Sequence, residues 1–171
     1  MACNICRFPE VAELVTVCWL EIIGKVNTNS LSPDTNYAAY LVFKISEEAY
    51  GLYSPAEVAV KTAGGQSDTR TVYLDRQEGQ NQRYQIIPRR IGVFSRIRHM
   101  TGIQPTMQRE GDLKVPKQRA DGWLEVEIGE FWTQRDEDEE VEMSVKEVKA
   151  GNWKGGLTVE GIEVRPKPVN V

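Results

Sequence analysis

The stretch DGWLEVEIGEFWTQRDEDEEVEMSVKEV, residues 121–148, decides the fold class of this chain. Its first part, WLEVEI (123–128), alternates Leu124, Val126 and Ile128 with other residues, and VEMSVKEV (141–148) repeats the pattern. Alternation with a period of two is typical of a strand that has one face on the core and one in solvent. The stretch therefore predicts two strands joined by an acidic loop.

Five further runs have the length and the β-branched composition of strands. They are VAELVTVCWLEIIGKV (11–26), YAAYLVFKI (37–45), AEVAVKTA (56–63), TVYLD (71–75) and GLTVEGIEVRP (156–166). Clusters of Gly, Pro, Asn and Asp separate them, and no segment has the pattern of a long amphipathic helix. The chain is thus predicted to be all-β, an antiparallel β-sandwich, and Gly161 is predicted to permit a bulge or a close approach of another backbone in the last strand.

The first of these runs, residues 11–26, carries apolar side chains on both of its faces. A strand of this kind is expected in the centre of a sheet, covered on both sides. Trp19 is therefore predicted to belong to the core, because aromatic side chains supply much of a core's apolar area; contact with a ligand is the alternative.

The length of 171 residues and an apolar content of 40% suit one ordinary domain. We expect a flexible N-terminal segment at residues 1–10 and a single domain over residues 11–171. Residues 76–119 lack periodicity, so they are predicted to form a long irregular insert within that domain. The insert places four arginines near Phe94: Arg89, Arg90, Arg96 and Arg98. Basic groups beside a stacking aromatic suit RNA, whereas a solvated basic loop is the alternative.

The net charge of -4 gives the chain as a whole no electrostatic preference for nucleic acid. We expect no membrane insertion, because polar residues interrupt the apolar run near the N-terminus. The three cysteines, Cys3, Cys6 and Cys18, make an odd number, which fits a reducing cytoplasm better than a set of disulfides.

Catalysis is poorly supported by the sequence. The single histidine, His99, lies in the irregular insert, and no nucleophile motif or phosphate-binding loop is present. Cys3 and Cys6 form a C-x-x-C pair, but two further ligands at metal spacing are missing. We therefore expect no enzyme activity, no metal and no cofactor.

Binding is better supported, through aromatic residues that follow predicted strands. Phe131 and Trp132 end one strand, and Trp153 stands in AGNWKGG (150–156) between Asn152 and Lys154. An aromatic plane beside amide and charged groups suits a sugar, and we expect the two clusters to be neighbours at one end of the sandwich. Trp153 folded back over the core edge is the alternative.

Glu147 falls on the same strand face as Met143 and Val145, yet its side chain is charged. An inward carboxylate needs donors or a place beyond the rim of the core. Its position just before Asn152 makes it a candidate ligand contact, and a place on the rim is the alternative.

Three long motifs, VAELVTVCWLEIIGKVNTNSLSPDTNYAAYLVFK, RADGWLEVEIGEFW and EVEMSVKEVKAGNWKGGLTVEGIEVRPK, closely resemble the phloem lectin family of plants, the Nictaba-like lectins. The resemblance extends from about residue 8 to residue 167. It implies a jelly-roll β-sandwich that dimerises and binds N-acetylglucosamine oligomers (chito-oligosaccharides) and the cores of N-glycans. It also implies a lone lectin module in the cytoplasm or phloem sap. KVPKQR matches the family's nuclear signal poorly, so nuclear entry is not expected.

The family's motifs imply that carbohydrate is bound by Glu130, Phe131, Trp132, Asn152, Trp153 and Lys154. Glu147, singled out above from its strand face, completes the set of predicted carbohydrate-binding residues. The disulfide-linked filaments associated with phloem lectins imply that Cys3 and Cys6 form bridges between chains, while Cys18 stays reduced in its strand. The rival function is a phloem protein or RNA interaction module that uses the insert. MACNICRFPE favours this rival, because family members usually carry a Trp/Tyr-rich segment there.

Overall fold

The computed structural model describes residues 10–75, 114–135 and 138–168. Within these ranges the chain forms nine strands and one short 3₁₀ helix, η1 (Thr28–Ser30). The strands are β1 (Ala12–Leu14), β2 (Leu20–Asn27), β3 (Thr35–Tyr50), β4 (Ala56–Thr62), β5 (Ser67–Val72), β6 (Lys117–Gln118), β7 (Leu124–Thr133), β8 (Glu140–Glu147) and β9 (Gly155–Pro166). No α-helix occurs in the described ranges, as predicted.

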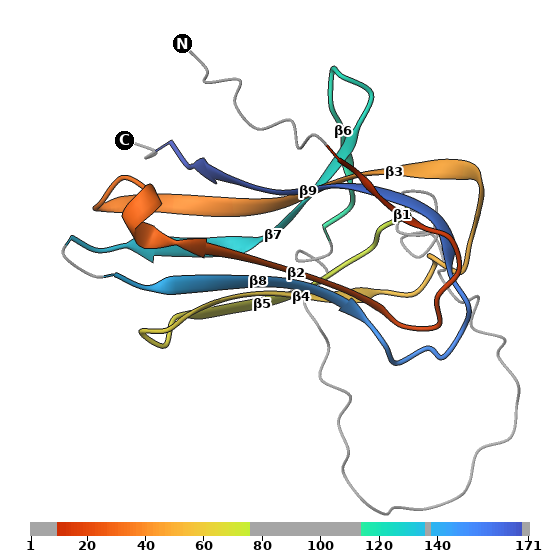
Figure 1. Ribbon diagram of the computed structural model, residues 1–171, viewed down its shortest axis with the longest axis horizontal. Helices are drawn as coiled ribbons and strands as arrows, with labels where there is room; N and C mark the ends of the chain where they lie inside the picture. Colours follow the sequence, from red (N-terminus) through yellow and green to blue (C-terminus); the bar gives the residue numbers. More distant parts are fainter. Residues whose placement is uncertain (1–9, 76–113, 136–137, 169–171) are drawn as a thin grey trace, which may run out of the picture.

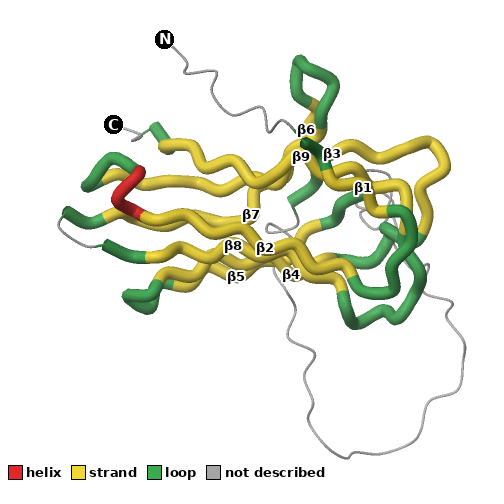
Figure 2. Tube along the Cα trace, in the orientation of Figure 1, coloured by secondary structure: helices red, strands yellow, loops and turns green. Residues whose placement is uncertain are grey.

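The strands form two antiparallel sheets, which lie one above the other in Figure 1 and Figure 2. The upper sheet has the order β1-β9-β3-β7-β6 and the lower sheet has the order β2-β8-β4-β5. Strands from the two ends of the chain pair with one another, β1 with β9 and β2 with β8. This is the double Greek-key order of a jelly roll, which confirms the predicted fold class.

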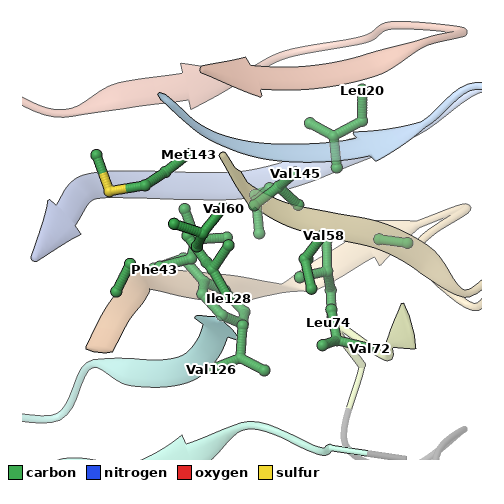
Figure 3. Close-up of a cluster of buried hydrophobic side chains, with 14 of the residues drawn as sticks. Leu20, Phe43, Val58, Val60, Val72, Leu74, Val126, Ile128, Met143 and Val145 are labelled. Carbon is green, nitrogen blue, oxygen red and sulfur yellow. The ribbon is translucent and has the colours of Figure 1, made fainter. Parts of the chain in front are cut away.

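The core fills the space between the sheets with the residues that alternate inward. The core includes Val126 and Ile128 of β7 and Met143 and Val145 of β8, and Figure 3 shows side chains of both sheets meeting between them. A bulge in β7 opposite Ala39 and Tyr40 changes the alternation. Phe131 therefore also points into the core, although it lies three residues after Ile128.

The interpretation of residues 11–26 as one central strand is wrong. β1 and β2 belong to different sheets, and each is an edge strand, because the chain crosses from one sheet to the other through residues 15–19. Trp19 is not a core residue: it is 70% exposed. Apolar residues on both faces of the run therefore reflect a crossing between sheets rather than cover on both sides.

The bulge predicted at Gly161 is present, since the register between β3 and β9 shifts between Val42, opposite Gly161, and Phe43, opposite Val159. Of the predicted insert, residues 114–119 contribute β6 and a bridge from Lys114 to Val72. Residues 76–113, with the four arginines and His99, lie outside the described residues, as do Cys3 and Cys6. The predictions made for them stay predictions.

Candidate functional site

The connections β1–β2, β3–β4 and β8–β9 lie at one end of the sandwich, the right-hand end in Figure 1, and four exposed aromatic residues lie in or beside them. We call this surface the aromatic end; it consists of Trp19, Tyr50, Tyr53 and Trp153. Trp19 precedes β2, Tyr50 ends β3, Tyr53 lies in the β3–β4 connection, and Trp153 lies in the β8–β9 connection. Trp153 is 62% exposed, so the structure does not place its indole as a cover over the core.

Backbone and side-chain hydrogen bonds tie the three connections of the aromatic end together. Val17 and Lys154 exchange two backbone bonds, with N···O distances of 2.9 and 2.7 Å. The Asn152 Nδ2 donates to the Gly51 carbonyl over 2.8 Å, and the hydroxyls of Thr16 and Tyr50 are 2.7 Å apart. The aromatic side chains therefore stand on a connected support.

Gly51 is required where the β3–β4 connection passes the β8–β9 connection. Its φ of +73° is left-handed, and a Cβ atom there would lie 2.0 Å from the Trp153 carbonyl oxygen. Such a distance is impossible for real atoms, so only glycine permits this approach. The close contact sets the backbone on which the Trp153 indole is carried.

Lys154 and Glu147 form an ion pair beneath the aromatic end. Lys154 is only 1% exposed, and its Nζ donates to the carbonyls of Cys18 and Asn152 over 2.9 and 2.8 Å. The Glu147 Oε1 accepts the backbone N–H of Ala150 over 3.0 Å. Glu147 thus meets its need for donors inside the protein, and both side chains are buried under the surface that a ligand would touch.

Phe131 and Trp132 lie at the opposite end of the molecule, so the prediction that the two aromatic clusters are neighbours is wrong. β8 connects them and runs from one end to the other, about 27 Å for eight residues. Phe131 is buried and stacks on Tyr37, with 5.8 Å between the ring centroids. Trp132 is 45% exposed, and Gln66 bonds to both its backbone N–H and its carbonyl.

Glu130, beside Trp132, is held by three partners. The Lys167 ammonium lies 2.6 Å from its Oε1, Asn36 donates to its Oε2 over 3.0 Å, and Arg70 donates over 3.4 Å. The bond from Lys167, with those from Asn36 and Arg70, lowers the pKa of Glu130 to about 2, against a smaller opposing effect of burial. Glu130 is therefore a fixed anion within a network of charges.

Charged side chains are scarce in the three connections of the aromatic end, although Glu47 and Glu48 are exposed before Tyr50 in β3. In the connections 15–19, 51–55 and 148–154 the charged residues are Lys149, which is exposed, and Lys154, which is buried and paired. Aromatic rings and backbone amides without a net charge suit a neutral ligand rather than a phosphate or a carboxylate.

Two observations on metal ions and membrane spans apply only to the residues that the structure describes. No group of three or more His, Cys, Asp or Glu side chains that could hold a metal ion occurs there. The described residues also contain no helix with the length and apolar character needed to span a bilayer.

Sequence reasoning missed Tyr50 and Tyr53 as members of the candidate site, and it gave ligand contact by Trp19 only as the alternative to a place in the core. Trp19 was placed in the core by its apolar neighbours, and the two tyrosines follow a strand without any motif. The length of the sixteen-residue run gave no signal for Trp19, because β3 is a strand of the same length.

The domain model of phloem protein 2 matches residues 3–166 of this sequence. The chain belongs to the phloem protein 2 family. This phloem protein 2 chain is similar to the F-box protein PP2-B13 of Arabidopsis thaliana, with 44% identity over 164 residues that cover 95% of the chain and 56% of the relative. The phloem protein 2 family is the phloem lectin family, so the resemblance noted in the sequence is confirmed.

Two further Arabidopsis thaliana proteins match the phloem protein 2 chain over similar lengths. F-box protein PP2-B15 is 41% identical over 169 residues, covering 96% of the chain, and F-box protein VBF is 41% identical over 162 residues, covering 94%. In both matches the alignment covers 56% of the relative. The phloem protein 2 chain thus spans about half the length of these relatives.

Proposed function

We propose that this domain is a non-enzymatic lectin and that the aromatic end is its sugar site. The observation that carries the proposal is the gathering of four exposed aromatic side chains, from three connections, over a buried ion pair. Large exposed apolar side chains on a soluble surface mark an interaction site. Membership of the phloem lectin family makes a carbohydrate the best-supported ligand.

The chemistry of the surface favours neutral amino sugars, which we propose to be N-acetylglucosamine oligomers and the cores of N-glycans. Indole and phenol rings can pack against the apolar face of a pyranose ring and the methyl group of an acetamide. Phenolic hydroxyls and exposed backbone groups supply donors and acceptors for hydroxyls. The low charge of the three connections suits an uncharged oligosaccharide.

The candidate residues named from the sequence take different parts in this proposal. Trp153, joined by Trp19, supplies stacking surface, and Asn152 holds its connection against Gly51. Lys154 and Glu147 act from below by positioning the connections. Trp132 and Glu130 stay predicted as sugar contacts, on a second surface over the buried Phe131, too far from Trp153 for one short oligosaccharide to touch both.

A shallow surface of this kind implies modest affinity, with a Kd in the micromolar to millimolar range, about -4 to -8 kcal/mol. Useful binding would then depend on more than one site, so a homodimer acting on glycoproteins in the cytoplasm or phloem sap is part of the proposal.

Calorimetry with chitotriose tests the proposal through three variants. Trp153→Ala and Trp19→Ala are each expected to weaken binding by about 1–3 kcal/mol, roughly five-fold to more than a hundred-fold, because each removes a stacking surface. Trp123→Ala is the control, since it removes a partly exposed indole that belongs to neither proposed sugar surface. Absence of heat from the folded wild-type protein at millimolar sugar contradicts the proposal.

A further inference from the structure

β2 is a long edge strand whose outer side has no partner in the described ranges. Eight residues of β2 pair with β8 on one side, so every second backbone N–H and C=O points away from the sheet. Such an edge is a template for another strand. Ile23, at its centre, is 50% exposed on the outer face of the sheet.

The other edges of the two sheets do not offer the same opportunity. β1 has three residues and β6 has two. β5 is longer, but side chains from its end of the sheet already bond to the backbone of β7. The Asp68 carboxylate accepts the Glu130 N–H over 3.0 Å, and Gln66 bonds to Trp132. The side of the sandwich at β5 and β7 is therefore closed, whereas all eight residues of β2 have no partner on their outer side in the described ranges.

The sequence of β2 is complementary to itself when it runs antiparallel to a second copy. Glu21 and Lys25 stand two residues before and two residues after Ile23, and all three are exposed. A two-fold axis at Ile23 puts Glu21 opposite Lys25 of the second copy and Ile23 opposite its equivalent. On the inner face Leu20 meets Val26, and Ile22 meets Gly24. Opposite charges and apolar pairs across strands are stabilising.

Shifting the two-fold axis by one residue in either direction removes the pairing of Glu21 with Lys25. An axis at Ile22 would put Glu21 opposite Ile23, and an axis at Gly24 would put Lys25 opposite Ile23. Each of these arrangements sets a charge against the exposed isoleucine and leaves Glu21 and Lys25 without each other. The pattern of the strand thus selects one register.

We propose that two copies of this chain associate by antiparallel pairing of their β2 strands about a two-fold axis at Ile23. The lower sheets of the two copies then form one continuous eight-stranded sheet. The same register sets Trp19 of each chain opposite Asn27 of the other, so each aromatic end lies beside η1 of the second copy. The interface specifies the dimer of the proposed function, but it does not depend on the sugar.

Disulfide cross-linking tests the register, in a background with Cys3, Cys6 and Cys18 changed to Ser. Cβ atoms of opposite residues lie within disulfide range in paired strands. Ile23→Cys is therefore expected to cross-link with itself on mild oxidation. Glu21→Cys and Lys25→Cys are each expected to stay monomeric alone and to cross-link when the two proteins are mixed. Failure of Ile23→Cys to cross-link, or cross-linking of Glu21→Cys alone as readily as the mixture, overturns the proposal.

Analytical ultracentrifugation of the full chain gives an independent test. The wild type is expected to be dimeric, and Lys25→Glu is expected to raise the dissociation constant about tenfold, because Glu21 then faces a carboxylate. Glu21→Lys with Lys25→Glu restores opposite charges across the axis and is expected to recover association. The melting temperature of each variant controls for folding, because Glu21 and Lys25 also pair with Lys146 and Glu140 of their own chain.

The outcomes separate the interface from the proposed function. A wild-type chain that stays monomeric at submillimolar concentration overturns both the interface and the proposed dimer. A dimer in which Ile23→Cys does not cross-link overturns the interface alone. A cross-linked Ile23→Cys dimer that does not bind chitotriose supports the interface and overturns the proposed sugar site.

Discussion

The residues of the aromatic end are of two kinds: some are exposed to a ligand, and others are buried and hold the exposed residues in position. The pattern NWK in the sequence marks three consecutive candidates, yet Trp153 is exposed while Lys154 is buried. Alternation along the chain predicts that neighbours face opposite ways, but it does not say which of them faces inward. The lysine faces inward because Glu147, also placed inward by its strand, supplies the compensating charge.

Replacing Lys154 with Met is expected to lower the free energy of unfolding by about 3–5 kcal/mol, because Glu147 is left as a buried, unpaired charge. Denaturant unfolding measures the loss. The control is Lys149→Met, which removes an exposed lysine that pairs with Glu57 and should change stability little. Equal stability of the two variants would show that the buried pair is not important for the fold. Glu147→Met combined with Lys154→Met should recover part of the loss.

Glu130 makes the stability of the domain depend on acid pH. Its pKa is lowered from the ordinary 4.5 to about 2, chiefly by the Lys167 ammonium, so the folded state binds the proton less well than the unfolded state. The stabilisation is therefore complete above pH 4.5 and is lost as the pH falls from 4.5 to about 2. Unfolding curves for the wild type and Glu130→Gln should converge over this interval. A constant difference between the two proteins down to pH 2 is the opposing result.

At the scale of elements, the strands with clear alternation were predictable and their partners were not. β7 and β8 were recognised from period-two patterns, which depend only on which face is buried, and β9 was recognised from its length and β-branched composition. The crossing at residues 15–19 was missed, because a strand that leaves one sheet and enters another keeps an apolar composition throughout. The bulge opposite Ala39 was also missed, since it depends on pairing between strands far apart in the sequence.

Gly51→Ala tests the contact between the β3–β4 and β8–β9 connections. The left-handed backbone alone costs a non-glycine residue about 1–2 kcal/mol. At Gly51 a clash with the Trp153 carbonyl adds to this cost. Gly65→Ala is the control, because its φ is also positive but a Cβ there meets nothing within 4 Å. Gly51→Ala should be clearly less stable than Gly65→Ala and should bind chitotriose more weakly; equal behaviour of the two contradicts the packing described.

For the whole molecule, the sequence patterns predict a sandwich, and the jelly-roll order follows from the family resemblance. Composition and periodicity do not determine which strands from the two ends of the chain pair, such as β2 with β8. The same limit explains why Trp132 and Trp153 were expected to be neighbours. A strand between two loops sends them to opposite ends of a sandwich, and that geometry becomes clear once β8 is known to run the full length.

The central claim is that a sugar binds at the aromatic end, and the four tryptophans of the chain report on it directly. Nuclear magnetic resonance of the indole N–H groups during a titration with chitotriose measures each site separately. The account predicts that the resonances of Trp19 and Trp153 move together with one dissociation constant, while Trp123 stays in place. Resonances of Trp19 and Trp153 that remain unmoved at millimolar chitotriose, on a folded sample, would contradict it.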